Sequence, residues 1–281
     1  MLIIYNKYRS LKMISESELS DSYEKIIADS INSLSKDSIY LAERPAASNK
    51  FSDVLIKRND GVSSWLEVKM NHRAGLGSPR VYYSDYECGW CTTYKTPSAA
   101  FAVNLLNSSN EAAMWIKQFK KWLCKELIIS DNEKLHEIVC RHRNDNHYRP
   151  CDLKIVLPTT AGGLDLHGAI PVEVMNKFVS EHNRNILNYE CDITDIVTDH
   201  YLVGKSEPAY YIQIDDDLYR LGDENPFKWS VPKLSITSGN IIARVSISSG
   251  KLYEIQIDIK SSEVCSSDYS LKPDSIKMRP F

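Results

Sequence analysis

Apolar residues recur at helical spacing in two segments of the first half of the chain. In residues 15–35 an apolar residue returns every three or four positions, and serines near the start can cap a helix. Residues 110–129 place large apolar side chains on one broad face and most of their lysines elsewhere. Both segments are predicted to be amphipathic helices.

Short β-prone runs lie between and after these helices. "SIYLAE" (38–43) reads as a strand, and "FSDVLIKRNDGVSSWLEVKM" (51–70) carries two runs around Asn59-Asp60-Gly61, a combination typical of a hairpin turn. Residues 71–98 are rich in glycine, serine, proline and aromatic residues, which favours an irregular surface loop. "DLKIVLP" (152–158) is an apolar run ended by proline, as in a buried strand.

The second half has a different pattern. Residues 171–187 and 192–203 look helical, and they are followed by the strand candidates "AYYIQI", "LYRLG", "NIIARVSI" and "KLYEIQIDI". We therefore expect an α/β (α+β) protein with a mixed central sheet flanked by helices and an antiparallel, β-rich C-terminal half. The segments 1–160 and 161–281 are expected to form one integrated structure.

Composition narrows the class of protein only slightly. The chain has 281 residues, a net charge of −3 and seven cysteines. No apolar run approaches the roughly 20 residues of a membrane span, and the N-terminal segment lacks a signal-peptide pattern. An odd number of scattered cysteines fits free thiols in a reducing compartment, so we expect a cytoplasmic protein with no membrane partner.

The predicted hairpin carries an unusual set of charged residues. Glu67 and Lys69 are two apart on one strand and therefore project from the same face, while Leu66 and Val68 project from the other. Asp53 begins the partner strand, and closure of the hairpin brings its carboxylate toward Glu67. Two adjacent carboxylates repel each other, and a divalent cation such as Mg²⁺ relieves that repulsion.

A metal held by Asp53 and Glu67 suits phosphodiester hydrolysis. Mg²⁺ can stabilise charge on a scissile phosphate and lower the pKa of bound water. Lys69, beside the metal, can orient or help to deprotonate the attacking water. The expected chemistry is metal-assisted hydrolysis.

The spacing of Asp53 and Glu67-Val68-Lys69 resembles the signature of the PD-(D/E)XK nuclease superfamily. The resemblance covers residues 15–158, with a helix and strand before the hairpin and a helix and strand after it, and Ser52 stands where the signature has proline. A chain of this size without helicase motifs looks most like a type II restriction endonuclease. The resemblance implies metal binding by Asp53 and Glu67, a catalytic role for Lys69, and a further acidic residue on the first helix, for which Glu24 is the candidate.

Two alternatives to this site remain open. Glu67 and Lys69 could be an exposed cross-strand pair on a solvated sheet face, with Asp53 capping a loop. A second motif of the same form, Asp258-Ile259-Lys260, has Asp215–Asp217 or Asp223 upstream. We expect its polar residues on the solvent face of a late strand.

Other clusters carry weaker signals. Cys88 and Cys91 form one Cys-x-x-Cys pair, which Cys140, His142, His147 and Cys151 could complete as a zinc site, although reduced thiols are the simpler interpretation. The glycine-rich segment 159–168 holds Asp165 and His167 and is interpreted as a turn or a DNA-contacting loop.

DNA contacts are expected next to the catalytic strand. The predicted DNA-binding residues are His72, Arg73, Arg80, Tyr82 and Tyr83, with Tyr86 beyond them, because basic side chains contact phosphates or guanine and aromatic rings stack. Residues 141–149, "RHRNDNHYR", are a second basic candidate.

The sequence thus favours a Mg²⁺-dependent, sequence-specific endonuclease acting on double-stranded DNA as a homodimer, because a two-fold symmetric protein matches a palindromic site. In this interpretation the segment 161–281 serves recognition or dimerisation. A repair or structure-specific nuclease with the same core, and a non-catalytic DNA-binding module, are the alternatives.

Overall fold

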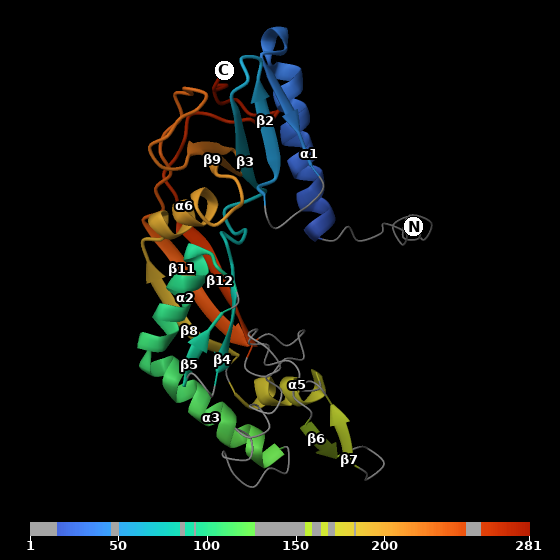
Figure 1. The fold of residues 1–281 in the computed structure, drawn as a ribbon, viewed down its shortest axis with the longest axis vertical. Helices are drawn as coiled ribbons and strands as arrows, with labels where there is room; N and C mark the ends of the chain where they lie inside the picture. Colours follow the sequence, from blue (N-terminus) through green and yellow to red (C-terminus); the bar gives the residue numbers. More distant parts are fainter. Residues whose placement is uncertain are drawn as a thin grey trace, which may run out of the picture. The chain divides into compact units, whose positions relative to one another are not determined.

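The computed structural model of the chain describes residues 16–45, 51–84, 88–92, 94–126, 155–158, 164–167, 172–182, 184–245 and 254–281. The chain forms two compact units, each built from separate segments (Figure 1). Unit 1 comprises Met1–His72, Glu207–Lys233 and Ser266–Phe281, and unit 2 comprises Arg73–Ser206 and Leu234–Cys265. These units do not follow the predicted boundary at residue 160, because two late segments return to the N-terminal one.

Unit 1 is a mixed five-stranded sheet with one long helix. The strand order is β1-β2-β3-β9-β10, in which β3 and β9 are parallel and all other neighbours are antiparallel. The elements are α1 (Glu16–Leu34), the short 3-10 helix η1 (Lys36–Ser38), β1 (Tyr40–Glu43), β2 (Val54–Arg58), β3 (Ser63–Lys69), β9 (Ala209–Ile214) and β10 (Asp217–Arg220).

Helix α1 confirms the predicted first helix, with a narrower apolar face than the sequence suggested. Ile27 and Ile31 are fully buried against the sheet core, whereas Leu19 and Ile26 are more than 40% exposed, at 42% and 44%. Only the face of α1 that meets Val54 and its neighbours is therefore covered.

The predicted hairpin is also confirmed. The amide of Arg58 donates to the carbonyl of Val62 at 2.8 Å and closes a loop over Asn59, Asp60 and Gly61. Gly61 has a φ of 90°, a left-handed conformation that glycine adopts at little cost. The turn fixes which residues of β2 and β3 face each other: Val54 pairs with Leu66.

The strand beside β3 comes from the second half of the chain. The strand candidate 152–158 follows a helix in chain order, as expected, but within the described residues its strand β6 (Ile155–Pro158) pairs with β7 (Leu164–His167) in a separate two-stranded sheet. β9, from the second half of the chain, lies parallel to β3 instead. This pairing needs a long crossover, which local sequence patterns do not reveal.

Unit 2 is built on an antiparallel five-stranded sheet of order β5-β4-β12-β11-β8. Helices α2 and α6 contact each other, and α2 also contacts β4 and β5. The elements are β4 (Arg80–Ser84), β5 (Gly89–Cys91), α2 (Pro97–Ser108), α3 (Asn110–Glu126), α5 (Val172–Glu181), β8 (Asn185–Cys191), α6 (Thr194–Leu202), β11 (Ser238–Val245) and β12 (Glu254–Glu263), together with β6 and β7.

Two expectations for this region need correction, and one helix was not predicted. The predicted loop 71–98 contains β4 and β5, and its last two residues already belong to the unpredicted helix α2. The signal for α2 was present, since Thr96 caps the helix through a hydrogen bond from the amide of Ala99 and Pro97 occupies its first turn. The predicted helix 171–187 ends at Glu181, because the chain enters β8 at Asn185.

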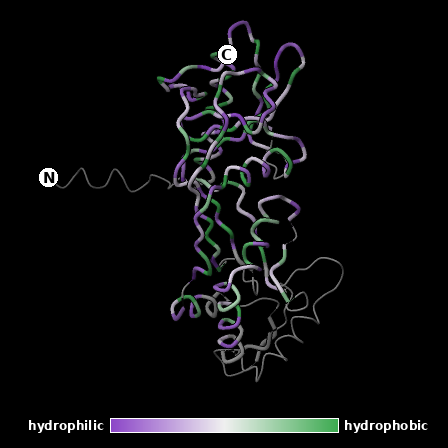
Figure 2. Tube along the Cα trace, turned by 90° about the vertical axis from the view of Figure 1, so that its left-hand side faces the viewer, coloured by the Kyte–Doolittle hydropathy of each residue, from purple (hydrophilic) through white to green (hydrophobic). Residues whose placement is uncertain are grey.

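Buried and more exposed residues alternate along β1 and β11, whereas β3 and β9 are buried along most of their length; Figure 2 gives the hydropathy of each residue along the chain. On β11 every second residue is buried. Among the described helices, none is both long and apolar enough to cross a membrane.

Candidate active site

Asp53, Glu67 and Lys69 meet at one end of the β2–β3 hairpin in unit 1. Asp53 lies one residue before the Val54–Leu66 pair, so the antiparallel register places it opposite Glu67. One carboxylate oxygen of Asp53, Oδ2, accepts a hydrogen bond of 2.8 Å from the amide of Val68, between Glu67 and Lys69. The turn at Gly61 sets the register of the two strands, and this hydrogen bond holds the carboxylate of Asp53.

Glu67 is a buried carboxylate with a cationic neighbour. It is only 3% exposed, and its Oε1 lies 2.6 Å from Nζ of Lys69, whose side chain is 19% exposed. A carboxylate at this depth is rare unless it is paired. The burial is inconsistent with the alternative of a solvent-exposed Glu67–Lys69 pair on a sheet face.

The carboxyl group of Asp53 has a strongly raised pKa. Burial raises the pKa of its carboxyl group to about 7, and the negative charge of Glu67 adds to the rise; the ammonium of Lys69 and the hydrogen bond from Val68 act in the opposite direction. The neutral form of this carboxyl group is therefore favoured relative to that of an exposed aspartate. Strongly shifted pKa values of this kind are concentrated at functional sites.

The residues present fit a divalent cation. Two carboxylates from neighbouring strands supply hard oxygen donors, and the charge repulsion that raises the pKa of Asp53 is what a cation would remove. Within the described residues no group of three or more histidine, cysteine, aspartate or glutamate side chains is placed to hold a metal. One or two carboxylates are the protein ligands that Mg²⁺ commonly uses, with water and substrate phosphate as the others, and Asp53 and Glu67 could supply them.

The negative charge of Glu24, on α1, acts on the carboxyl group of Asp53. This charge contributes to the raised pKa of Asp53, as the smallest of the named causes. Its Oε2 accepts a 2.8 Å hydrogen bond from Nε of Arg44, which also pairs with Asp21 at 2.7 Å. The first helix thus brings a third acidic side chain near the hairpin, already held by an arginine.

Hydrogen bonds to backbone carbonyls, which sequence analysis did not identify, hold the end of β3. The carbonyl of Lys69 accepts a hydrogen bond from the amide of Asp215 at 2.8 Å, and the carbonyl of Asp215 accepts one from the Tyr23 hydroxyl at 2.6 Å. The side-chain amide of the buried Gln213 also donates a hydrogen bond of 2.8 Å, through its Nε2, to the carbonyl of Asp215. These partners come from α1, from β9 and from the turn that follows β9, so no local pattern could have paired them.

The second acidic-x-lysine motif has a different environment. Asp258 on β12 was expected on a solvent face, but it is 4% exposed. Its Oδ2 lies 2.5 Å from Nη2 of Arg244 on β11, and its Oδ1 accepts a 2.7 Å hydrogen bond from Gln256. The expectation of exposure was wrong because the sheet buries Asp258 beside an arginine that neutralises it. Its proposed upstream partners, Asp215–Asp217 and Asp223, belong to unit 1.

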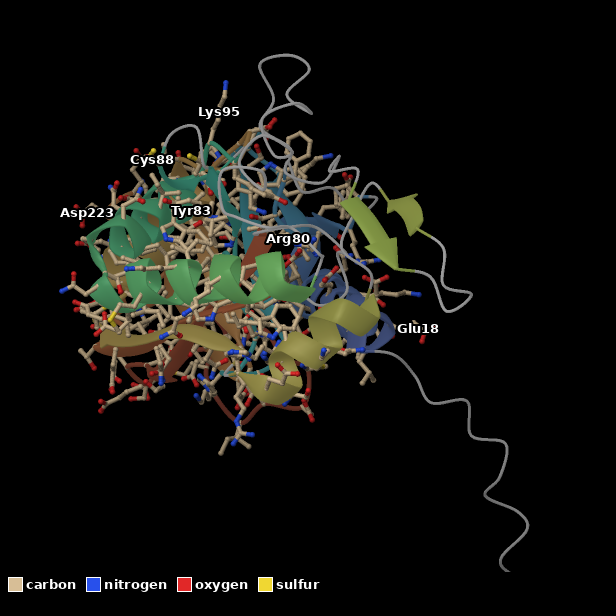
Figure 3. All side chains as sticks on the ribbon, turned by 90° about the horizontal axis from the view of Figure 1, so that it is seen from below. Glu18, Arg80, Tyr83, Cys88, Lys95 and Asp223 are labelled. Carbon is tan, nitrogen blue, oxygen red and sulfur yellow. The ribbon has the colours of Figure 1, made fainter. Side chains whose placement is uncertain are left out.

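The predicted DNA-binding residues are divided between the units. His72 belongs to unit 1, where its Nε2 lies 3.8 Å from Oδ2 of Asp217, and Arg73 begins unit 2 as an exposed residue. Arg80 and Tyr83 come from β4 and are labelled in Figure 3. Arg80 is exposed, whereas Tyr83 packs edge-to-face on Trp90 with ring centres 5.4 Å apart.

Tyr82 is part of β4 and pairs with Cys91 in the β4–β5 register. Arg80, Tyr82 and Tyr83 therefore belong to a strand, where the sequence analysis expected an irregular loop.

The remaining clusters receive little support. Cys88 and Cys91 are free thiols, and Cys140, His142, His147 and Cys151 lie outside the described residues, as do Tyr86 and the basic segment 141–149. Asp165 and His167 fall within β7 rather than in the predicted turn.

Comparison of the chain with protein-family models, with curated proteins and with solved structures gives no match.

Proposed function

We propose that the chain is a Mg²⁺-dependent endonuclease that hydrolyses phosphodiester bonds in double-stranded DNA, with the site specificity of a type II restriction enzyme. The observation that carries this proposal is the convergence of Asp53, Glu67 and Lys69 at one end of a buried hairpin. In unit 1, α1 and β1 precede the hairpin in the order that the sequence resemblance implies, whereas α3 and β6, which follow the hairpin in sequence, belong to unit 2 and β9 lies beside β3 instead.

Asp53 and Glu67 would hold the metal, with Glu24 nearby. When bound, Mg²⁺ supplies Lewis-acid stabilisation of the phosphate and a more acidic water. Glu67 is oriented by its contact with Lys69, and Asp53 by the amide of Val68, so both carboxylates are positioned before substrate arrives.

Lys69 would act on the water and on the phosphate charge. Its ammonium lies beside Glu67, where it can orient the attacking water and offset negative charge that develops on the phosphate. The water oxygen bonds to phosphorus, the bond from phosphorus to the leaving oxygen breaks, and the proton lost by the water balances the one gained by the leaving oxygen.

Cleavage of plasmid DNA in the presence of Mg²⁺ tests the proposal. We expect discrete fragments from the parent protein and a loss of about 10²- to 10⁴-fold in rate for Lys69→Ala. Lys57→Ala is the matched control, since this lysine of the same hairpin also pairs with a carboxylate, Glu43 at 2.7 Å, but on the exposed surface.

Equal cleavage by the parent and Lys69→Ala would overturn the assignment of the site. Sequencing of the cut ends separates a site-specific enzyme, which gives fixed ends, from a structure-specific nuclease, which does not. The mass of the protein in solution tests the proposed homodimer.

A further inference from the structure

Three consecutive aspartates lie against the end of β3, within unit 1. They are Asp215, Asp216 and Asp217, at the turn from β9 into β10, and we call them the acidic turn. The amide of Asp215 donates a hydrogen bond of 2.8 Å to the carbonyl of Lys69, the last residue of β3. Oδ2 of Asp217 lies 3.8 Å from Nε2 of His72, three residues further along the chain. The acidic turn therefore contacts the chain at two points where it leaves β3.

The C-terminal segment Ser266–Phe281, also in unit 1, supplies partners for the acidic turn. Nζ of Lys277 lies 2.6 Å from Oδ1 of Asp217, and the hydroxyl of Ser270 donates a 2.8 Å hydrogen bond to Oδ1 of Asp216. These contacts balance the charge of the turn and fix its position. We therefore interpret the acidic turn as a support for β3 and not as a second metal site.

Tyr23 of α1 reaches the same turn. Its ring packs against the sheet core, and its hydroxyl donates a hydrogen bond of 2.6 Å to the carbonyl of Asp215. Nε2 of Gln213 donates to the same carbonyl at 2.8 Å. Asp215 has a φ of 51°, in the left-handed region that residues other than glycine adopt at a cost, so both hydrogen bonds help to hold it there.

Asp215 connects Tyr23 with Lys69. Its carbonyl accepts from the Tyr23 hydroxyl and its amide donates to the Lys69 carbonyl, so two hydrogen bonds join α1 to the end of β3. Nζ of Lys69 lies 2.6 Å from Oε1 of Glu67, and a shift of the end of β3 would change this contact. A misplacement of about 1 Å in an active site can lower a rate by about 100-fold.

We propose that Tyr23 is a positioning residue, which through the acidic turn holds the end of β3 so that the ammonium of Lys69 stays beside Glu67. This role rests on the proposed function, in which Lys69 acts on the attacking water and the phosphate. Tyr23 acts through Asp215 and transfers no proton in the reaction.

Single-turnover cleavage of plasmid DNA in Mg²⁺ tests the proposal with Tyr23→Phe, which keeps the ring and removes the hydroxyl. We expect the rate constant at saturating protein to fall about 10-fold, because Gln213 still holds the carbonyl of Asp215. The protein concentration that gives half of the maximal rate should not change, since Tyr23 does not contact DNA. Because no proton transfer is lost, the rate should fall by the same factor at every pH tested.

Tyr211→Phe is the matched control. It also removes a tyrosine hydroxyl from unit 1, one that donates to Oδ1 of Asn225 and accepts from the amide of Phe227. Tyr211 is fully buried, so its variant should lose at least as much stability as Tyr23→Phe. We expect it to cleave DNA at the rate of the parent.

Amide hydrogen exchange tests the same connection without DNA or metal. We expect the amide of Asp215 to exchange about 5- to 10-fold faster in Tyr23→Phe than in the parent, since local opening of the turn becomes easier. The amide of Arg58, which donates to the carbonyl of Val62 at the other end of the hairpin, should exchange at the same rate in both proteins.

Equal cleavage rates for the parent and Tyr23→Phe, with Lys69→Ala inactive, would overturn the proposal and leave the nuclease standing. An equal loss of rate in Tyr211→Phe would also overturn it, because the effect would then follow general stability. If the parent cleaves no DNA, the proposed function fails and hydrogen exchange decides. Faster exchange of Asp215 alone upholds the hold of Tyr23 on the end of β3, and unchanged exchange refutes it.

Discussion

Two acidic-x-lysine motifs of the chain, one on β3 and one on β12, have opposite surroundings. Each acidic residue lies on an inner strand of a five-stranded sheet, and each is less than 5% exposed: Glu67 at 3% and Asp258 at 4%. Across from Glu67 lies another carboxylate, Asp53, whereas Asp258 is met by Arg244.

This difference shows what makes such a motif a candidate site. The Asp258–Arg244 pair is neutral and needs no further ligand, so it serves the stability of the sheet. Beside Glu67, one lysine faces two carboxylates, and the excess negative charge raises the pKa of Asp53. The charge repulsion that a cation would relieve comes from Asp53, which the neighbouring strand places opposite Glu67, and not from the motif itself.

The largest expected difference between the motifs is in metal binding. We expect Glu67→Gln to abolish the rise in melting temperature that Mg²⁺ produces in the parent and to slow DNA cleavage by at least about 100-fold, since a neutral amide is a poor ligand for Mg²⁺. Thermal unfolding with and without Mg²⁺, and the plasmid assay, measure both effects. An unchanged Mg²⁺-dependent rise would show that the metal binds elsewhere.

The variant Asp53→Asn tests the raised pKa of Asp53 through the pH dependence of folding stability. Since the pKa of Asp53 rises from 3.8 to about 7 on folding, the folded chain binds more protons between these values, and its stability falls as pH increases through that window. The amide of Asp53→Asn does not ionise. In the absence of metal this variant should therefore be more stable than the parent at pH 8, by up to about 4 kcal/mol.

Urea unfolding at pH 5 and pH 8 checks this expectation. The advantage of Asp53→Asn should be smaller at pH 5, where the parent carboxyl group is mostly protonated. In the parent, Mg²⁺ affinity should increase as pH rises through about 7, because the cation competes with the proton on Asp53. A stability difference that does not depend on pH would contradict the raised pKa.

The smallest effect is expected for Asp258→Ala. Removing this carboxylate leaves the guanidinium of Arg244 without its buried counter-charge, which should lower the free energy of unfolding by about 1 to 3 kcal/mol, because Arg244 is 32% exposed and partly solvated. The Mg²⁺-dependent rise in melting temperature should stay the same as in the parent. Loss of that rise in the folded variant would mean that the two motifs had been assigned the wrong way round.

Local sequence by itself determined the hairpin and its face. Asn59-Asp60-Gly61 supplies a glycine for the left-handed position of the turn, and the two-residue period of a strand places Glu67 and Lys69 together. The helix before the hairpin follows equally from periodicity. Helix α2 was missed although Thr96 and Pro97 carry its start signal, because the glycine- and serine-rich segment before it was interpreted as one loop.

Only the tertiary structure decided which distant segments complete each sheet and how deeply each charge is buried. β9 lies beside β3 although about 140 residues separate them, and Asp258 meets Arg244 through the pairing of β11 with β12. Alternation along a strand says which residues share a face, but it does not say whether that face meets solvent or protein. That depends on the elements that pack against it, and these come from parts of the chain that no local pattern connects.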